Sequence, residues 1–125
     1  MAGKGLFAKI WAGLAGDRHR DTRNAKVAAA LRAEGDSLDQ PRRVRHWAYF
    51  PNESAQARFI AMLGLRFEEI STDSSPVADA NMQGVTFWHV GLPDEASMTP
   101  ITDMLRRFAT ECDGEYDGWE TQVVR

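Results

Sequence analysis

The sequence predicts an α+β fold in which two helices cover one face of a four-stranded antiparallel sheet. Four segments alternate apolar and polar residues with the period of a strand, and two others repeat apolar residues with the period of a helix. Gly and Pro separate these segments in the order β-α-β-β-α-β, after an extra N-terminal helix. This is the order of a ferredoxin-like sandwich. We therefore expect central first and third strands, with the last strand antiparallel to the first.

Length and composition fit one globular domain. The chain has 125 residues, of which 43% are apolar and 26% charged, enough for a core without disulfides. The single cysteine, Cys112, excludes an intramolecular disulfide and is typical of a reducing compartment. It falls on the apolar face of a predicted helix, so we interpret it as a buried thiol. No apolar run approaches the 18 residues of a transmembrane helix.

Charge is distributed unevenly along the chain. Residues 1–62 carry eleven Lys and Arg against six Asp and Glu, whereas residues 63–125 carry four against twelve. Such a division is typical of a basic contact surface, or of two halves that folding interleaves. We favour the second interpretation.

Residues 1–16 have amphipathic character. Five apolar side chains fall on one helical face near two lysines: Leu6, Phe7, Ile10, Trp11 and Leu14, with Lys4 and Lys9. The pattern fits contact with a membrane surface or a partner, and equally a terminal helix packed on its own domain. Lys9 and repeated glycines break the apolar stretch, so it is not a secretory signal. We divide the chain into a basic amphipathic extension over 1–21 and a domain over 22–125.

The first elements of the domain are a helix over residues 23–34 and a strand over residues 44–50. Gly35 ends the helix, because glycine readily takes the left-handed conformation there. Pro41 stands just before the strand, because it cannot donate to a ladder. Alternation divides the strand between two faces: Val44, His46, Ala48 and Phe50 on one, and Arg45, Trp47 and Tyr49 on the other.

The next helix covers residues 53–63. Typical capping residues flank it: Asn52 or Ser54 before it and Gly64 after it. A second strand follows over residues 65–72, in which Leu65, Phe67 and Glu69 alternate with Arg66, Glu68 and Ile70. Residues 73–83 are rich in turn formers and predict a loop at the tip of a hairpin.

The third strand covers residues 84–90 and also alternates. Its two faces carry Val85, Phe87 and His89, and Thr86, Trp88 and Val90. Thr99 is the expected N-cap of the last helix, with Pro100 at its first position. That helix runs to Cys112, and a closing strand covers residues 114–124.

Histidines supply the one candidate for chemistry. His46 and His89 fall on strands that should be adjacent, and Asp117 or Glu115 nearby would make a metal site or an acid–base pair. The alternative is two strand histidines with backbone or carboxylate partners. The chain has no HxH, HExxH, CxxC or GxSxG motif. We therefore expect no enzyme, no cofactor and no metal site.

Aromatic residues on the strands predict a binding surface on the open face of the sheet. Such a face can form a protein interface or stack single-stranded bases. A basic rim of Arg42, Arg43 and Arg45 is opposed by Glu115, Asp117 and Glu120 on the neighbouring strand, which favours a protein partner over nucleic acid. The rings could also pack under the N-terminal helix. The candidate partner-binding residues are Trp47, Tyr49, Trp88 and Trp119.

The closing strand contains an irregularity. Asp117-Gly118 interrupts the alternation between Tyr116 and Trp119, which predicts a β-bulge with Gly118 at a positive φ. The bulge would keep both rings on one side. The Asp117 carboxylate would then bind a backbone amide, His46 or an arginine of the first strand.

Three stretches resemble the ribonuclease E inhibitor family, regulator of ribonuclease E activity B, over about residues 22–125. The stretches are Glu115-Tyr116-Asp117-Gly118-Trp119 followed by Thr121; Gly35-Asp36-Ser37-Leu38-Asp39-Gln40-Pro41-Arg42 followed by His46-Trp47-Ala48-Tyr49-Phe50; and Gly64-Leu65-Arg66-Phe67.

The resemblance implies a ferredoxin-like sandwich that binds ribonuclease E in the bacterial cytoplasm and restrains its cleavage of RNA without cutting RNA itself. Two alternatives stay open: a ligand binder or enzyme that uses His46, His89 and Asp117, and a single-strand RNA binder. We interpret the shared positions as mostly structural: Asp36, Pro41, Arg42, His46, Phe50, Gly64, Glu115, Tyr116, Asp117, Gly118 and Trp119.

Overall fold

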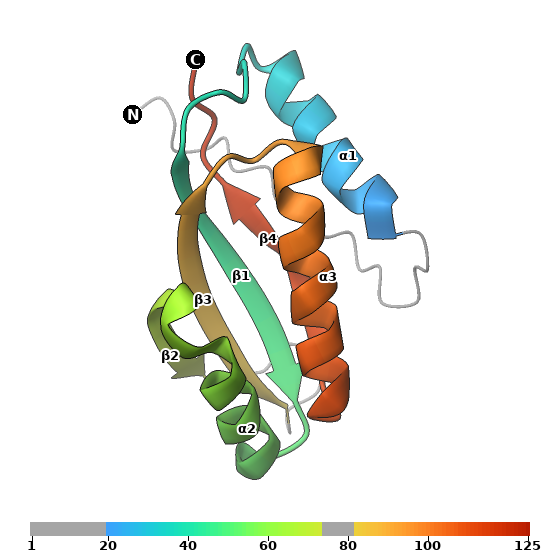
Figure 1. The fold of residues 1–125 in the computed structure, drawn as a ribbon, viewed down its shortest axis with the longest axis vertical. Coiled ribbons are helices and arrows are strands. Elements are labelled where there is room, and N and C mark those ends of the chain that lie inside the picture. Colours follow the sequence, from blue (N-terminus) through green and yellow to red (C-terminus); the bar gives the residue numbers. More distant parts are fainter. Residues whose placement is uncertain (1–19, 74–81) are drawn as a thin grey trace.

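The computed structural model describes residues 20–73 and 82–125, and these form an α+β fold (Figure 1). The elements are α1 (Arg20–Ala33), β1 (Arg42–Phe50), α2 (Glu53–Leu63), the 3-10 turn η2 (Gly64–Arg66), β2 (Glu68–Asp73), β3 (Gln83–Gly91), α3 (Glu95–Glu111) and β4 (Glu115–Thr121). The amphipathic extension and the tip of the predicted hairpin lie outside the described residues. Within those ranges, no helix has the length and apolar character needed to cross a membrane.

The strands form one antiparallel sheet in the order β2-β3-β1-β4. As predicted, β1 and β3 are central and β4 pairs antiparallel with β1. The predicted alternation on β1 is confirmed, because Val44, His46, Ala48 and Phe50 are all buried. Helices α2 and α3 lie across this buried face, and α1 lies beside α3 (Figure 1).

The core has two clusters. The larger lies between the sheet and helices α2 and α3, and includes Phe50, Phe59, Phe87 and Leu105. In the smaller cluster, Val27 and Leu31 of α1 pack with Met98 and Trp119. Helix α1 is thus part of the packed domain.

Helix ends agree with the sequence prediction at α2 and differ at α3. The Asn52 side chain accepts a 2.8 Å hydrogen bond from the Ala55 amide, and α2 ends at Gly64 with a φ of 59°. Helix α3 begins at Glu95, so the prediction of Thr99 as N-cap is wrong. Asp94 is the N-cap and accepts from the Ser97 amide at 3.1 Å.

The predicted second strand is also corrected. Residues Gly64–Arg66 form a 3-10 turn, and β2 begins only at Glu68. Leu65 and Phe67 do not share one face of a strand as predicted, because Leu65 is fully exposed and Phe67 is buried. A register shift between Glu68 and Ser71 interrupts the alternation, and Glu69 there has a φ of 49°. The strand period therefore misplaces the residues before and around this irregularity.

The predicted β-bulge in β4 is confirmed. Trp47 pairs with Gly118 and Ala48 with Tyr116, which leaves Asp117 as the extra residue. Gly118 has a φ of 131°. Tyr116 and Trp119 are both buried on the face under the helices. The bulge thus restores the inward direction of Trp119 after a spacing of three.

We expect Gly118→Ala to lower the free energy of unfolding by about 1 kcal/mol or more, because an L residue is strained at this φ. Urea denaturation followed by circular dichroism measures the change. Ser71→Ala, an exposed change in β2 without a positive φ, is the control and should change little. A Gly118→Ala protein as stable as the parent would contradict the strain argument.

Candidate functional site

The side of the sheet opposite α2 and α3 carries an aromatic face. Residues of β1 and β3 that alternate with the buried set make it up: Arg43, Arg45, Trp47, Tyr49, Trp88 and Val90. The three rings are half-buried, and Val90 is 55% exposed. The predicted candidates Trp47, Tyr49 and Trp88 therefore share one surface.

Arginine side chains stack between the tryptophans of the aromatic face. The Arg43 Cζ atom lies 4.1 Å from the centre of the Trp88 ring. The Arg45 Cζ atom lies 4.8 Å from the centre of the Trp47 ring and 5.6 Å from that of Trp88. Cation–π contacts of this kind contribute about 0.5–1 kcal/mol each at exposed sites. They order the rings before any partner arrives.

Carboxylates balance the two guanidinium charges. Arg43 contacts Glu69 at 2.7 Å, and Arg45 contacts Glu120 at 3.8 Å. Arg42, predicted as part of a basic rim, is buried on the opposite face instead. The aromatic face is therefore a surface of mixed charge rather than a cationic stripe.

Trp119 does not belong to the aromatic face, which corrects its place among the binding candidates. It is 4% exposed, and its indole N–H donates a 2.9 Å hydrogen bond to the Asn24 side-chain oxygen. The Asn24 amide group donates in turn to the hydroxyls of Thr102, at 3.0 Å, and Thr99, at 3.3 Å. One buried asparagine thus joins α1, α3 and β4.

The predicted neighbours His46 and His89 are in contact. His46 Nε2 lies 2.8 Å from His89 Nδ1, and His46 Nδ1 lies 2.7 Å from the Tyr116 hydroxyl oxygen. The His46 ring is fully buried and stacks on Phe87, with Phe67 edge-on. Three neighbouring strands therefore share one buried polar chain.

Hydrogen-bond satisfaction favours one direction of donation along this chain. If Tyr116 donates to His46 Nδ1, then His46 Nε2–H donates to His89 Nδ1, and only His89 Nε2 lacks a partner within the described residues. In the reverse direction His89 donates to His46 and His46 donates to Tyr116. The Tyr116 hydroxyl proton would then have no acceptor among these three side chains. Burial lowers the pKa of both histidines, and for His46 the His89 ring adds to this. Burial also raises the pKa of Tyr116. All three groups are therefore neutral near pH 7.

We expect both folded histidines to bind protons with midpoints below pH 6.5. Their pKa values lie below the ordinary 6.5, so near this pH the unfolded chain binds protons that the folded protein does not. Lowering the pH through 6.5 therefore destabilises the fold, and the fully buried His46 contributes up to about 1.4 kcal/mol per pH unit. Proton NMR of the imidazole Cε1–H signals checks this. Titration of either ring with a midpoint near 6.5 would contradict it.

The predicted contact between the Asp117 carboxylate and His46 does not form. Both nitrogens of His46 are used by Tyr116 and His89. The Asp117 backbone oxygen accepts a 2.9 Å hydrogen bond from Arg23 of α1. Burial raises the pKa of the Asp117 carboxyl, and the nearby Arg23 charge opposes this rise. No set of three His, Cys, Asp or Glu within residues 20–73 and 82–125 is arranged to hold a metal ion.

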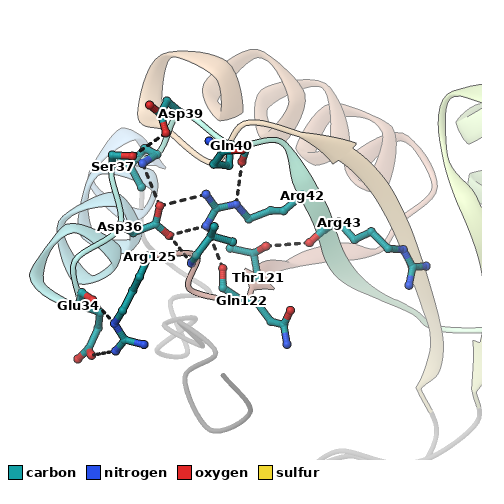
Figure 2. A network of polar contacts seen from close by, with 12 residues as sticks. Glu34, Asp36, Ser37, Asp39, Gln40, Arg42, Arg43, Thr121, Gln122 and Arg125 are labelled. Atoms are coloured by element: carbon teal, nitrogen blue, oxygen red, sulfur yellow. Dashed lines mark hydrogen bonds and ion pairs between the residues drawn. The ribbon is translucent and has the colours of Figure 1, made fainter. Parts of the chain in front are cut away.

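A second polar cluster lies where the loop before β1 meets the C-terminal residues (Figure 2). The guanidinium of Arg42 contacts both carboxylate oxygens of Asp36, and the second of these contacts is 3.0 Å. The Asp36 carboxylate also accepts from the backbone amides of Leu38, at 2.9 Å, and Val124, at 3.0 Å. Arg42 donates further to the backbone oxygens of Gln40 and Gln122. The charges are thus fully paired although both side chains are buried.

This Asp36–Arg42 cluster holds the C-terminal residues against the loop. Burial alone would raise the pKa of the Asp36 carboxyl, but hydrogen bonds from Arg42 and the Val124 and Leu38 amides lower it to about 2. Two further hydrogen bonds join the same parts of the chain (Figure 2). The Thr121 hydroxyl donates to the Arg43 backbone oxygen at 2.7 Å, and the Arg125 guanidinium donates to the Glu34 carboxylate at 3.2 Å.

The remaining shared positions mostly lie at structural sites. Phe50 is fully buried, and a Cβ atom at Gly114 would stand 2.2 Å from its ring. Gly64 takes a positive φ at a helix end. Pro41 and Glu115 are exposed, at the start of β1 and of β4. Most of the shared positions thus have a structural explanation.

The family model described as regulator of ribonuclease activity B matches residues 21–121. A search of the curated proteins finds no match to the chain. The matched residues include every described helix and strand except the first residue of α1.

Proposed function

The chain belongs to the regulator of ribonuclease activity B family, and from this premise we propose that it is a non-catalytic regulator that binds ribonuclease E, or a related RNA-processing protein, and restrains RNA cleavage. The aromatic face is the observation that carries the proposal. It provides an ordered set of Trp, Tyr and Arg side chains, the residue types most enriched at the centres of protein interfaces.

Charge balance on the aromatic face supports a protein partner over RNA. A surface that binds nucleic acid neutralises phosphates with lysines and arginines. Here Arg43 and Arg45 already contact Glu69 and Glu120, and phosphate binding would have to break these ion pairs. A protein surface can instead pack on the rings and leave the pairs at the rim.

The histidine chain supports a non-catalytic role. His46 is fully buried under the helices, so a substrate could contact its ring only after the core opens. Tyr116 and His89 bind both ring nitrogens of His46, which leaves neither nitrogen for Asp117, the third member of the alternative enzyme site. The geometry therefore gives the enzyme reading no support.

A pull-down from a bacterial lysate, with and without ribonuclease treatment, tests the proposal. We expect the tagged protein to recover ribonuclease E in both cases. Recovery of RNA alone, lost after treatment, would favour the base-stacking alternative, and its affinity should then fall steeply with added salt. Recovery of neither would contradict the proposal.

We further propose that the fold is a ferredoxin-like sandwich with α1 added and that the protein acts in the bacterial cytoplasm. The strand order and the two helices on one face support the first point, and the family resemblance supports the second. An experimental structure with β2 or β4 at the centre of the sheet would contradict the fold. Fractionation of the native host would contradict the location if the protein appeared outside the cytoplasm.

A further inference from the structure

The described chain begins beside the edge strand of the sheet. Arg23, in the first turns of α1, donates to the backbone oxygen of Asp117 in the bulge of β4. The next residue of that strand, Gly118, pairs directly with Trp47 of the aromatic face. The nineteen residues that precede Arg20 are therefore attached beside the edge strand β4, on the side of the helices. To reach the aromatic face they would have to pass around that edge.

Residues 1–16 are long enough to cross the sheet. A helix of sixteen residues measures about 24 Å. Neighbouring strands lie about 4.8 Å apart, so the four strands span about 15 Å. The segment is about 9 Å longer than the sheet is wide, so its last residues, together with residues 17–19, are available for the connection around the edge of β4.

The outer strands supply acidic residues on the side of the aromatic face. Residues directly opposite in an antiparallel pair project to the same side. Glu68 of β2 pairs with Trp88, and β4 contributes two more such residues: Glu115 opposite Tyr49, and Glu120 opposite Arg45. The surface thus has an aromatic centre with carboxylates along both margins.

The sequence of residues 1–16 is complementary to that surface. It gathers five apolar side chains on one helical face, and its charged residues are Lys4 and Lys9. Apolar side chains would cover the rings while the lysines reach the exposed carboxylates at the margins, those of Glu68 and Glu115. A tethered segment also meets the surface at an effective concentration of about millimolar, which favours it over a second copy or a free partner.

We propose that residues 1–16 dock across the aromatic face of their own chain and cover Trp47 and Trp88. The docking rests on where the segment is attached, on its length and on the complementary charges of the two surfaces. Its regulatory consequence rests on the proposed function: a partner that binds the aromatic face must displace this segment.

NMR signals of the tryptophan indole N–H groups test the docking. We compare the full chain with a chain that starts at Asp17, assigning signals by single Trp→Phe variants. The signals of Trp47 and Trp88 should shift and exchange faster with water in the shorter chain. The Trp119 signal should stay unchanged, because its N–H is bonded to Asn24. Unchanged Trp47 and Trp88 signals would overturn the proposal.

Two double variants separate docking from deletion effects. Leu6→Ser with Ile10→Ser alters the apolar side of the segment and should reproduce the deletion. Ala8→Ser with Ala12→Ser alters the opposite side and should leave all indole signals as in the full chain. Indole shifts that disappear on dilution would indicate a second copy as the occupant. Shifts that need vesicles of phosphatidylcholine and phosphatidylglycerol would indicate a membrane. Either result would overturn the proposal.

Affinity for purified ribonuclease E tests the consequence separately. The shorter chain should bind about tenfold more tightly, the factor expected if the face is uncovered about a tenth of the time. Equal affinities would overturn the competition. No binding by either chain, together with the expected indole shifts, would remove the proposed function and leave the docking in place.

Discussion

Replacement of Asp36 with Ala is expected to lower the free energy of unfolding by about 3–5 kcal/mol, the range for breaking a buried ion pair. The change leaves the Arg42 guanidinium buried without its counter-charge, since that side chain is 6% exposed. It also removes the acceptor for the backbone amides of Leu38 and Val124. Urea denaturation at pH 7 measures the loss.

Asp39→Ala is the matched control for this prediction. Asp39 lies in the same loop, but it is exposed and accepts from the Ser37 hydroxyl. Its replacement should change the free energy of unfolding by less than about 0.5 kcal/mol. The double variant Asp36→Ala with Arg42→Leu should recover part of the loss, because it no longer buries an unpaired charge. A loss below about 1 kcal/mol for Asp36→Ala alone would contradict the account of the cluster.

The same cluster predicts a pH dependence at strongly acidic pH. The folded pKa of Asp36 is about 2, below the ordinary 3.8, so the ionised group stabilises the fold above pH 3.8. This contribution is lost as the pH falls from 3.8 through 2. It is therefore separate from the loss at the histidines, which begins near pH 6.5.

Replacement of Trp47 or Trp88 with Ala is expected to weaken binding to the partner by about 30-fold or more. Central aromatic residues of interfaces contribute about 2–4 kcal/mol, and about 1.4 kcal/mol corresponds to a factor of ten in affinity. Loss of either ring also removes a platform on which Arg45 stacks. Calorimetric titration of purified ribonuclease E measures the change.

Leu65→Ala is the control for the aromatic face. Leu65 is a fully exposed apolar residue, but it lies in the turn after α2 and outside the aromatic face. Its replacement should leave the affinity unchanged. Circular dichroism must show that each tryptophan variant is folded. If folded Trp47→Ala and Trp88→Ala proteins bind as the parent does, the partner uses another surface.

The fold could be predicted largely because its central strands carry strong local patterns. In β1 buried residues alternate with partly or fully exposed ones, so alternation alone separates its two faces. In β3 the pattern is weaker, because Thr86 is buried although it lies on the side of Trp88. The positive φ at Gly118 could be predicted because Tyr116 and Trp119 are three residues apart. Both rings can face the same side of the strand only if an extra residue interrupts the alternation. In β2 the irregular conformation is taken by Glu69 itself, so no glycine marks this irregularity in the sequence.

The polar contacts could be predicted only in part. Adjacent strands placed His46 next to His89, but nothing local indicates that Tyr116 completes the chain. Asn24 follows a charged stretch and resembles a solvated residue, yet it binds Trp119 from a position 95 residues away. Such contacts depend on how α1 packs, which the sequence pattern of α1 alone does not specify.

The central claim is that this chain restrains a ribonuclease through its aromatic face. A cleavage assay tests it most directly, with purified ribonuclease E, a labelled RNA substrate and increasing amounts of the protein. The account predicts a slower cleavage rate with the parent chain and with Leu65→Ala, and an unchanged rate with Trp47→Ala and Trp88→Ala combined. Slowing by the double tryptophan variant equal to that by the parent, or no slowing by the parent at any concentration, would contradict the claim.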